Sequence, residues 1–446
     1  MNLLEEAKKL ISFRTVSEEG TKSLVHYLEP FCKRLGFQTT LQDDATHGYP
    51  NDINLIAFTK SDGSDLCPRG LLWVTHLDTV PPGNSTLWTK TGGNPFQATI
   101  LGDRIYGLGS ADTKLDFLCK LAAIERVGLK NIRIPFALIG TFGEEKSLGG
   151  ARLLKDSGLV HPRFVLVSEP SELHPVAAHK GMLYMKAVLT PPSPLAGEGW
   201  GEGEQKIFHG RAAHGSMPHL GENAILKALA WLDELIKEYP TAHLTSIEGG
   251  TVHNIVPDHC QLSWQKAPEG ASPGSQIIFL QKFLECSQKA EALLIQKKEV
   301  HFDPPQTTLN VGVIRTKEKT LEIEFDFRLI PNAESDALIT LFKKLECDVK
   351  GARIEVIRSN QPLSTSEDSE LAVYVKHALS DVGLQQTFLY KSGNTEGAIF
   401  NEMGAQSIVI GPGKSVGNIH APNEYNEMSQ LKKAVEFYTA FLQQFC

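Results

Sequence analysis

The feature of this chain that most constrains its fold is a series of short apolar runs, each ending in polar residues. In the first part of the sequence, runs at 70–77, 134–141 and 164–168 alternate with stretches of helical period. Short apolar runs separated by helical segments are typical of buried strands in an α/β sheet. Ligands bind at the carboxyl ends of such strands. The sequence therefore predicts an α/β fold whose site lies where these runs end.

The pattern changes after about residue 180. The stretches 244–264 and 307–328 each contain the two apolar runs of a β-hairpin, and 222–239 has the period of an amphipathic helix. Strands with helices on one face indicate a separate α+β domain. The α/β pattern returns after about residue 362, which indicates that the second domain is inserted into the first.

These changes divide the chain into two expected domains. We expect 1–180 and 362–446 to form a discontinuous catalytic domain, and 181–361 to form an inserted lid. Within the lid, 191–205 (PPSPLAGEGWGEGEQ) is rich in Pro, Gly and Glu. Such a composition does not continue a strand, so we expect a loop insertion at the surface.

Charge and cysteine content exclude several classes of protein. The chain has 44 Lys and Arg against 52 Asp and Glu, a net charge of −8, which argues against a broad surface for nucleic acid or anionic membrane. Its 7 cysteines are scattered, which fits a reducing compartment better than a disulfide framework or a thiolate zinc site. Neither a signal-peptide pattern nor a run of ~18 apolar residues is present. We therefore expect a cytoplasmic protein with no nucleic-acid or membrane partner.

The polar residues after the apolar runs are of the types that bind metals. They are His76 and Asp78, Asp112, Glu144 and Glu145, Glu169, and His420. Each has an ordinary explanation when taken singly; Asp112, for example, has the place of a helix N-cap. Together, two histidines and three carboxylates suit two divalent ions of the zinc class, one carboxylate bridging them. Two such ions can activate a shared water and polarise a carbonyl.

Hydrolysis at such a centre also needs a carboxylate that is not a ligand, to accept the proton of the water. The adjacent Glu144 and Glu145 can supply one residue for each task. Asp78, two residues beyond His76, can hold the imidazole through its second nitrogen and so fix the tautomer of the ligand. The residues alone thus indicate a dinuclear hydrolase.

Five motifs occur in order along the chain: HLDTVPPG (76–83), GSADTK (109–114), GEE (143–145), SEP (168–170) and HAPNEY (420–425). In kind and order they resemble the dinuclear zinc family that includes acetylornithine deacetylase, succinyl-diaminopimelate desuccinylase, aminoacylase and glutamate carboxypeptidase. The resemblance extends over nearly the whole chain. It implies a zinc-peptidase-like catalytic domain, with a mixed sheet flanked by helices, and an inserted α+β, ferredoxin-like lid that also serves for dimerisation.

The resemblance also implies a set of metal ligands. His76, Asp112 and Glu169 would hold one zinc ion. Asp112, Glu145 and His420 would hold the second, with Asp112 bridging the two. Cobalt or manganese would be able to replace zinc.

The remaining roles implied by the resemblance concern catalysis and substrate binding. Glu144 would be the general base, and Asp78 the carboxylate that orients the ligand. His214, in RAAHGS, would reach the site of the neighbouring subunit and stabilise the oxyanion, which implies a homodimer formed through the lid. Asn254 resembles the asparagine of the family's lid. Arg328, in FDFR, resembles the arginine that holds a substrate carboxylate, for which a bidentate guanidinium is well suited.

The sequence departs from the family pattern in two places. After Asp112 the family usually continues Met-Lys-Gly-Gly, whereas this chain has Thr-Lys-Leu-Asp. The family also runs from one hairpin directly into its arginine strand, whereas here Arg328 follows a second hairpin. The second departure leaves open whether Arg328 occupies the carboxylate-binding position.

The implied activity is hydrolysis of the amide bond of an N-acyl amino acid or short peptide. The segment SGNTEG (392–397) is closer to acetylornithine deacetylases than to desuccinylases, so an acetylornithine deacetylase-like activity leads. Glu396 would pair with a cationic amine of the substrate, or else be an exposed, solvated glutamate. The alternatives are a succinyl-diaminopimelate desuccinylase and a metallo-carboxypeptidase or dipeptidase; glutamate at position 169 argues against the aminopeptidase branch. An inactive binding homologue is a minor alternative, because no ligand of the set is missing.

Overall fold

The computed structural model describes residues 1–44, 49–60, 65–67, 69–190, 203–266, 274–317 and 320–446. These residues form two compact units. The first consists of Met1–His179, Leu363–Lys391 and Thr395–Cys446, and the second of Lys180–Pro362 with Ser392–Asn394. Most of the expected insertion, 191–202, lies outside the described residues. The assignment of the units as catalytic and lid domains stays a prediction.

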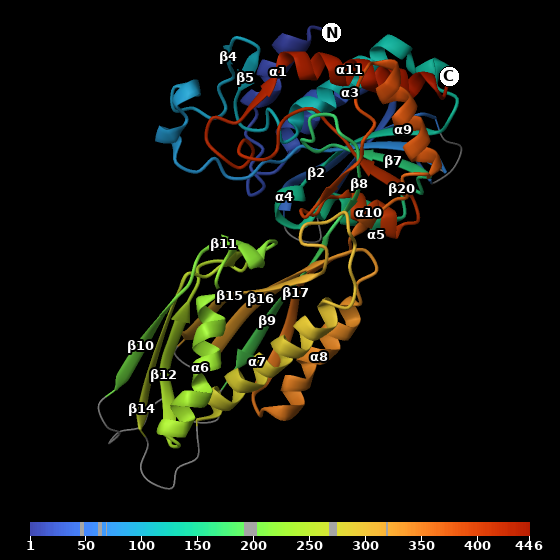
Figure 1. The fold of residues 1–446 in the computed structure, drawn as a ribbon. Helices are drawn as coiled ribbons and strands as arrows, with labels where there is room; N and C mark the ends of the chain where they lie inside the picture. Colours follow the sequence, from blue (N-terminus) through green and yellow to red (C-terminus); the bar gives the residue numbers. More distant parts are fainter. Residues whose placement is uncertain (45–48, 61–64, 68, 191–202, 267–273, 318–319) are drawn as a thin grey trace. The chain divides into compact units, whose positions relative to one another are not determined.

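A mixed sheet forms the centre of the first unit (Figure 1). Its order is β1 (Gln38–Asp44), β2 (Tyr49–Phe58), β6 (Phe136–Thr141), β3 (Leu71–His76), β7 (Phe164–Val167), β20 (Gln406–Val409), β8 (Val176–His179) and β18 (Leu363–Ser364), and β19 (Leu389–Lys391) also pairs with β8. Strands β6, β3, β7 and β20 run parallel. The predicted apolar runs are therefore neighbouring strands, and their carboxyl ends share one edge.

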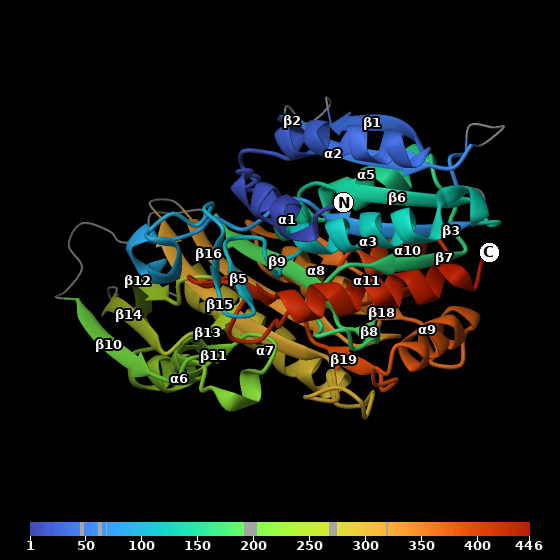
Figure 2. The same ribbon diagram turned by 90° about the horizontal axis from the view of Figure 1, so that it is seen from above.

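Helices cover both faces of this sheet (Figure 2). On β3, Leu71 and Trp73 face one core while Leu72 and Val74 face the other, as the alternation of side chains along a strand requires. The first core includes α1 (Leu3–Ser12), α2 (Lys22–Leu35), α3 (Lys114–Val127), α9 (Glu370–Asp381) and α11 (Met428–Gln443); the second includes α5 (Gly149–Ser157) and α10 (Gly397–Glu402). The prediction of a mixed sheet flanked by helices is confirmed.

A small antiparallel sheet and a short helix complete the first unit around the strand ends. The sheet consists of β4 (Thr99–Leu101), β5 (Arg104–Tyr106) and β21 (Tyr425–Glu427), and β5 is its central strand. The short helix, α4 (Glu144–Ser147), follows β6. Pairing of β21 with β5 joins the segment after His420 to the segment before Asp112.

The second unit contains a seven-stranded antiparallel sheet. Its order is β10 (Glu204–His209), β14 (His259–Lys266), β12 (Ala242–Gly249), β15 (Thr308–Lys317), β16 (Thr320–Leu329), β9 (Gly181–Leu189) and β17 (Ala352–Asn360). Three helices share one apolar core with the sheet: α6 (Ala224–Glu238), α7 (Ser275–Leu294) and α8 (Ser335–Asp348). Both predicted hairpins are present, as β12–β14 and β15–β16.

The two hairpins meet edge to edge within this sheet. Glu248 of β12 lies opposite Arg315 of β15, and Gly249 lies opposite Ile314. The second hairpin therefore extends the sheet formed by the first, which explains how an arginine that arrives one hairpin late in the sequence still belongs to the same sheet.

Candidate metal centre

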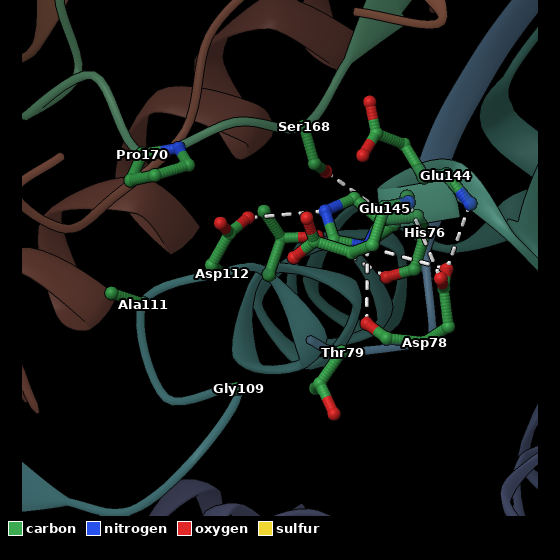
Figure 3. A network of polar contacts seen from close by, with 12 residues as sticks. His76, Asp78, Thr79, Gly109, Ala111, Asp112, Glu144, Glu145, Ser168 and Pro170 are labelled. Carbon is green, nitrogen blue, oxygen red and sulfur yellow. Dashed lines mark hydrogen bonds and ion pairs between the residues drawn. The ribbon is translucent and has the colours of Figure 1, made fainter. Parts of the chain in front are cut away.

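The predicted ligands gather at the edge where the parallel strands end. Figure 3 shows three of them, His76, Asp112 and Glu145. His76 is the last residue of β3, Glu169 follows β7, and Glu144 and Glu145 begin α4 after β6. Asp112 lies just before α3. Because β6, β3 and β7 are parallel neighbours, residues that follow them must lie close together.

Asp112 lies between the two histidines of the set. Its Oδ1 is 3.1 Å from Nε2 of His76, and its Oδ2 is 3.2 Å from Nε2 of His420. Nε2 of His420 is also 3.1 Å from Oε2 of Glu145. Each oxygen of Asp112 therefore faces a different histidine, as a carboxylate that bridges two cations requires.

Two overlapping groups of donor atoms surround His76. The donor atoms of His76, Asp112 and Glu145 lie within 4.8 Å of one another, and so do those of His76, Glu144 and Glu169. The structure thus brings the predicted base into the same cluster as the predicted ligands. The division of the ligands into two particular sets stays a prediction.

The carboxylate groups of this cluster lie close to one another and are largely withdrawn from solvent. Burial raises the pKa of Glu144 well above its ordinary value, and neighbouring Glu169 raises it further. Burial and Asp112 raise the pKa of Glu169 to about 8, and the same two causes raise that of Glu145. Oε1 of Glu145 is buried without a hydrogen-bond partner among the described residues. Such a cluster is stable in ionised form only beside positive charge, which divalent cations supply.

The histidines are already oriented as ligands. Nδ1 of His76 donates to the main-chain oxygen of Asp78 at 3.1 Å, which leaves the lone pair of Nε2 for a cation. Burial lowers the pKa of His76, but Asp112 and Asp78 more than offset this, so that it lies well above its ordinary value. Hydrogen bonds to Asp112 and Glu145 raise the pKa of His420 to about 11. The residues present therefore fit divalent cations, which would displace protons from the same atoms.

The carboxylate of Asp78 has a different set of contacts from the one expected. Its Oδ1 is 3.6 Å from Nδ1 of His76, too long for a direct hydrogen bond. It accepts instead the N–H groups of Glu144 at 3.1 Å and Glu145 at 3.3 Å (Figure 3). It also accepts the hydroxyl of Ser17 at 2.7 Å. Asp78 therefore orients the first turn of α4, which carries Glu144 and Glu145, and it holds the imidazole through its main chain.

Sequence reasoning missed Glu424, which fixes the loop of Asp112. Its Oε1 accepts the N–H groups of Ala111 at 2.8 Å and Asp112 at 3.1 Å, and its Oε2 accepts that of Gly109 at 3.2 Å. The side chain is fully buried, and burial raises its pKa to about 7. A signal was present, since Glu424 belongs to the HAPNEY motif that also contains His420.

His214 lies in the second unit, where β11 (Ala213–His214) pairs with β13 (Ile255–Val256). Nδ1 of its ring accepts the N–H of Ser216 at 3.2 Å, and the Ser216 hydroxyl lies 2.7 Å from the same nitrogen. Burial and the charge of Arg328 lower the pKa of His214. These contacts favour the neutral ring with its proton on Nε2, which is the form that donates a hydrogen bond to an oxyanion.

The second unit also contains Asn254 and Arg328. Nε of Arg328 donates to Oδ2 of Asp326 at 2.9 Å. Asn310 lies opposite Asp326 in the β15–β16 ladder. Its amide donates to the main-chain oxygens on both sides of Asn254, at 2.7 and 3.1 Å. The loop that carries Asn254 and the strand that carries Arg328 are thus linked through Asn310 of β15. Asp326 and Asn310 were not identified from the sequence.

Glu396 is fully buried in the first unit. Its Oε2 accepts the hydroxyl of Thr141 at 2.9 Å, and burial raises its pKa to about 7. The expectation of an exposed, solvated glutamate is therefore wrong, because α10, which begins at Gly397, packs into the second core. A role in substrate binding stays a prediction.

A family model described as peptidase family M20/M25/M40 matches residues 72–444. The chain belongs to this family. The prediction made from the five motifs is confirmed, and membership makes the protein a hydrolase of amide bonds. M20 metallopeptidases depend on metal ions, in agreement with the cluster around Asp112.

Named relatives and solved structures lie within the same family. An acetylornithine deacetylase of Photorhabdus laumondii subsp. laumondii is 30% identical over 59% of this chain and 67% of the relative. An acetylornithine deacetylase of Vibrio cholerae serotype O1 is 31% identical over 60% of this chain and 68% of the relative. The structure of aminoacylhistidine dipeptidase from Vibrio alginolyticus has a TM-score of 0.70 at 16% identity, covering 99% of this chain and 96% of that one. The structure of an M20 family metallo-carboxypeptidase from Sulfolobus solfataricus has a TM-score of 0.64 at 18% identity, covering 100% of this chain and 99% of that one. At these identities the structures show a shared fold.

Replacement of Glu424 by glutamine tests its role in holding the Asp112 loop. Glutamine has the same shape but loses the charge and presents an N–H₂ group to N–H donors, so we expect the free energy of unfolding to fall by about 1–3 kcal/mol. Urea denaturation of the metal-free protein measures this change. Glu436→Gln on the exposed face of α11 is the matched control and should change stability by less than about 0.5 kcal/mol. Equal stability of the two variants would contradict the assignment.

Proposed function

We propose that this protein hydrolyses the amide bond of an N-acyl amino acid, and that N-acetylornithine is its leading candidate substrate. One observation carries the chemistry: a carboxylate shared by two histidines, with an additional buried glutamate beside it. The names of the relatives supply the substrate class, since those at 30–31% identity are acetylornithine deacetylases.

His76, Asp112, Glu145, Glu169 and His420 would hold two zinc ions, which cobalt or manganese would be able to replace. When bound, such ions lower the pKa of a water molecule and polarise the carbonyl group of a substrate. The donor set supports this choice, because imidazole nitrogens and carboxylate oxygens without thiolates suit these ions.

Glu144 is the proposed general base. It takes a proton from the water as the water oxygen bonds to the acyl carbon. When the carbon–nitrogen bond breaks, Glu144 returns that proton to the amine that leaves. Its buried position beside His76 and Glu169 supports this role, since a carboxyl group whose pKa is raised toward neutrality can both accept and donate a proton.

The proposed roles in the second unit follow from the chemistry of each side chain. Nε2–H of His214 would donate to the oxyanion, a contribution typically worth about 3–4 kcal/mol. Arg328, held through its Nε by Asp326, would bind the substrate carboxylate with its terminal nitrogens, and Asn254 would add a polar contact. Glu396 would require a change in its surroundings to meet a substrate amine, because it is fully buried.

We also propose that the protein is a cytoplasmic homodimer that forms through its second unit, as the family resemblance implies. None of the described helices has both the length and the apolar composition that a membrane span requires. The arrangement assigns His214 to the site of the neighbouring chain.

A hydrolysis assay tests the proposed function. With added zinc or cobalt, the protein should release acetate from N-acetylornithine faster than it cleaves succinyl-diaminopimelate, other N-acyl amino acids or dipeptides. A chelator should abolish the activity, and metal should restore it. Cleavage of dipeptides alone would favour the peptidase alternative, and no hydrolysis by metal-loaded protein would revive the binding homologue.

Replacement of Glu144 by alanine tests the assignment of the base. We expect kcat to fall by about 100- to 10,000-fold while the protein keeps its metal content, because Glu144 is not among the proposed ligands. Metal analysis and steady-state kinetics measure the two effects. Glu18→Gln, an exposed glutamate of the same unit, is the control with unchanged kcat. Near-native turnover in Glu144→Ala would exclude it as the base.

A mixing experiment tests the source of His214. Glu144→Ala and His214→Ala should each be inactive alone. If two chains share each site, refolding them together should restore about one quarter of wild-type activity, since half of randomly mixed dimers carry one intact site. Absence of recovery in verified mixed dimers would mean that each chain completes its own site.

A further inference from the structure

A buried polar cluster lies directly behind the candidate metal centre. It contains Asp116 and Lys120 of α3, Thr75 of β3, Ser168 after β7, and Tyr438 of α11, all with exposed fractions of 2% or less. Asp116 is the last residue of Thr-Lys-Leu-Asp, the segment that departs from the family pattern. None of these five residues has a place in the proposed mechanism.

Lys120 uses its whole ammonium group in this cluster. Its Nζ donates to the main-chain oxygen of Val74 at 2.8 Å, to Oγ1 of Thr75 at 3.0 Å and to Oγ of Ser168 at 2.5 Å. An ammonium group has three donors, so each has one acceptor. Two of these acceptors belong to β3 and the third follows β7.

Asp116 is the acceptor that joins Ser168, Tyr438 and Lys120 in this cluster. Its Oδ2 accepts the hydroxyl of Ser168 at 2.5 Å and that of Tyr438 at 2.7 Å, and lies 3.6 Å from Nζ of Lys120. Ser168 donates its one hydroxyl proton to Asp116, so in the 2.7 Å contact between the two hydroxyls Thr75 must be the donor and Ser168 the acceptor. The hydrogen bonds among Lys120, Thr75, Ser168 and Asp116 therefore each have one direction, while Oδ1 of Asp116 is buried without a partner among the described residues.

The placement of the hydroxyl groups connects this cluster to the ligands. Thr75 immediately precedes His76, and Ser168 immediately precedes Glu169. The last paired residues of the β3–β7 ladder are Val74 and Val167, so the Thr75–Ser168 bond continues the connection between the strands by one residue. The helix that carries Asp116 and Lys120 begins two residues after Asp112.

Stability alone gives no reason for two charges in this core. A buried ion pair contributes little net stability, and apolar residues of similar volume often replace one without loss, whereas such pairs can specify a particular arrangement. We propose that Asp116 and Lys120 are positioning residues that set the separation of His76 and Glu169 and the orientation of Asp112. This inference rests on the proposed function only in that these three residues bind metal.

Removal of both charges tests the inference. Asp116→Ala/Lys120→Met should unfold at a urea midpoint close to that of the wild type. Titration of the metal-free double variant with zinc should show at least one of the two zinc equivalents bound about 10- to 100-fold more weakly than by the wild type. The kcat of the zinc-loaded double variant should fall, with little change in KM. A folded double variant with both affinities and kcat within threefold of the wild type would overturn the proposal.

A second pair of variants covers failure of the double variant to fold. Thr75→Val keeps the shape of the side chain but removes the hydroxyl, and should weaken zinc binding; Thr75→Ser keeps the hydroxyl and should restore it. Wild-type affinity in Thr75→Val would overturn the proposal. Ser287→Ala, which removes a buried hydroxyl from α7 of the second unit, should leave the titration unchanged. Absence of zinc binding by the wild type would contradict the proposed function instead.

Discussion

Asp112 is the side chain on which the rest of the centre depends. One oxygen faces His76 from β3 and the other faces His420 from a segment more than 300 residues away in sequence. Glu424 fixes the loop of Asp112 by three main-chain hydrogen bonds, and α3 continues from it. Small changes in this loop would alter both ligand groups together, since the two oxygens of one carboxylate cannot move independently.

The balance of charge explains what must surround the three glutamates of the centre. Glu144, Glu145 and Glu169 are held close together in a buried site where ionisation is unfavourable, so the energy needed to keep them there must come from cations and from the surrounding fold. In the second unit, by contrast, burial and a neighbouring positive charge favour the uncharged form of a histidine. His214 is kept neutral beside Arg328, which preserves one donor with a defined direction.

Much of the centre followed from sequence because strand ends are a local signal. The apolar runs that end in His76 and Glu169 identify strands, and parallel strands bring their ends together without further information. The fold class followed from the same alternation. Asp78 and Glu424 show where this reasoning stops: both belong to motifs that the sequence displays, but the motifs do not indicate that these carboxylates bind main-chain N–H groups of distant segments. Arg328 shows the same limit, because its place in the sheet depends on how two hairpins meet at β12 and β15.

The separation of these residues along the chain has a consequence for biosynthesis. His76 and Asp112 emerge from the ribosome early, whereas His420, Glu424 and Tyr438 follow the entire second unit. A nascent chain that has completed the second unit still lacks one of the proposed ligands, the anchor of the Asp112 loop and the tyrosine that binds Asp116. All the proposed ligands would therefore be present only after His420 has been synthesised, and metal acquisition would depend on the supply that the nearly complete chain meets.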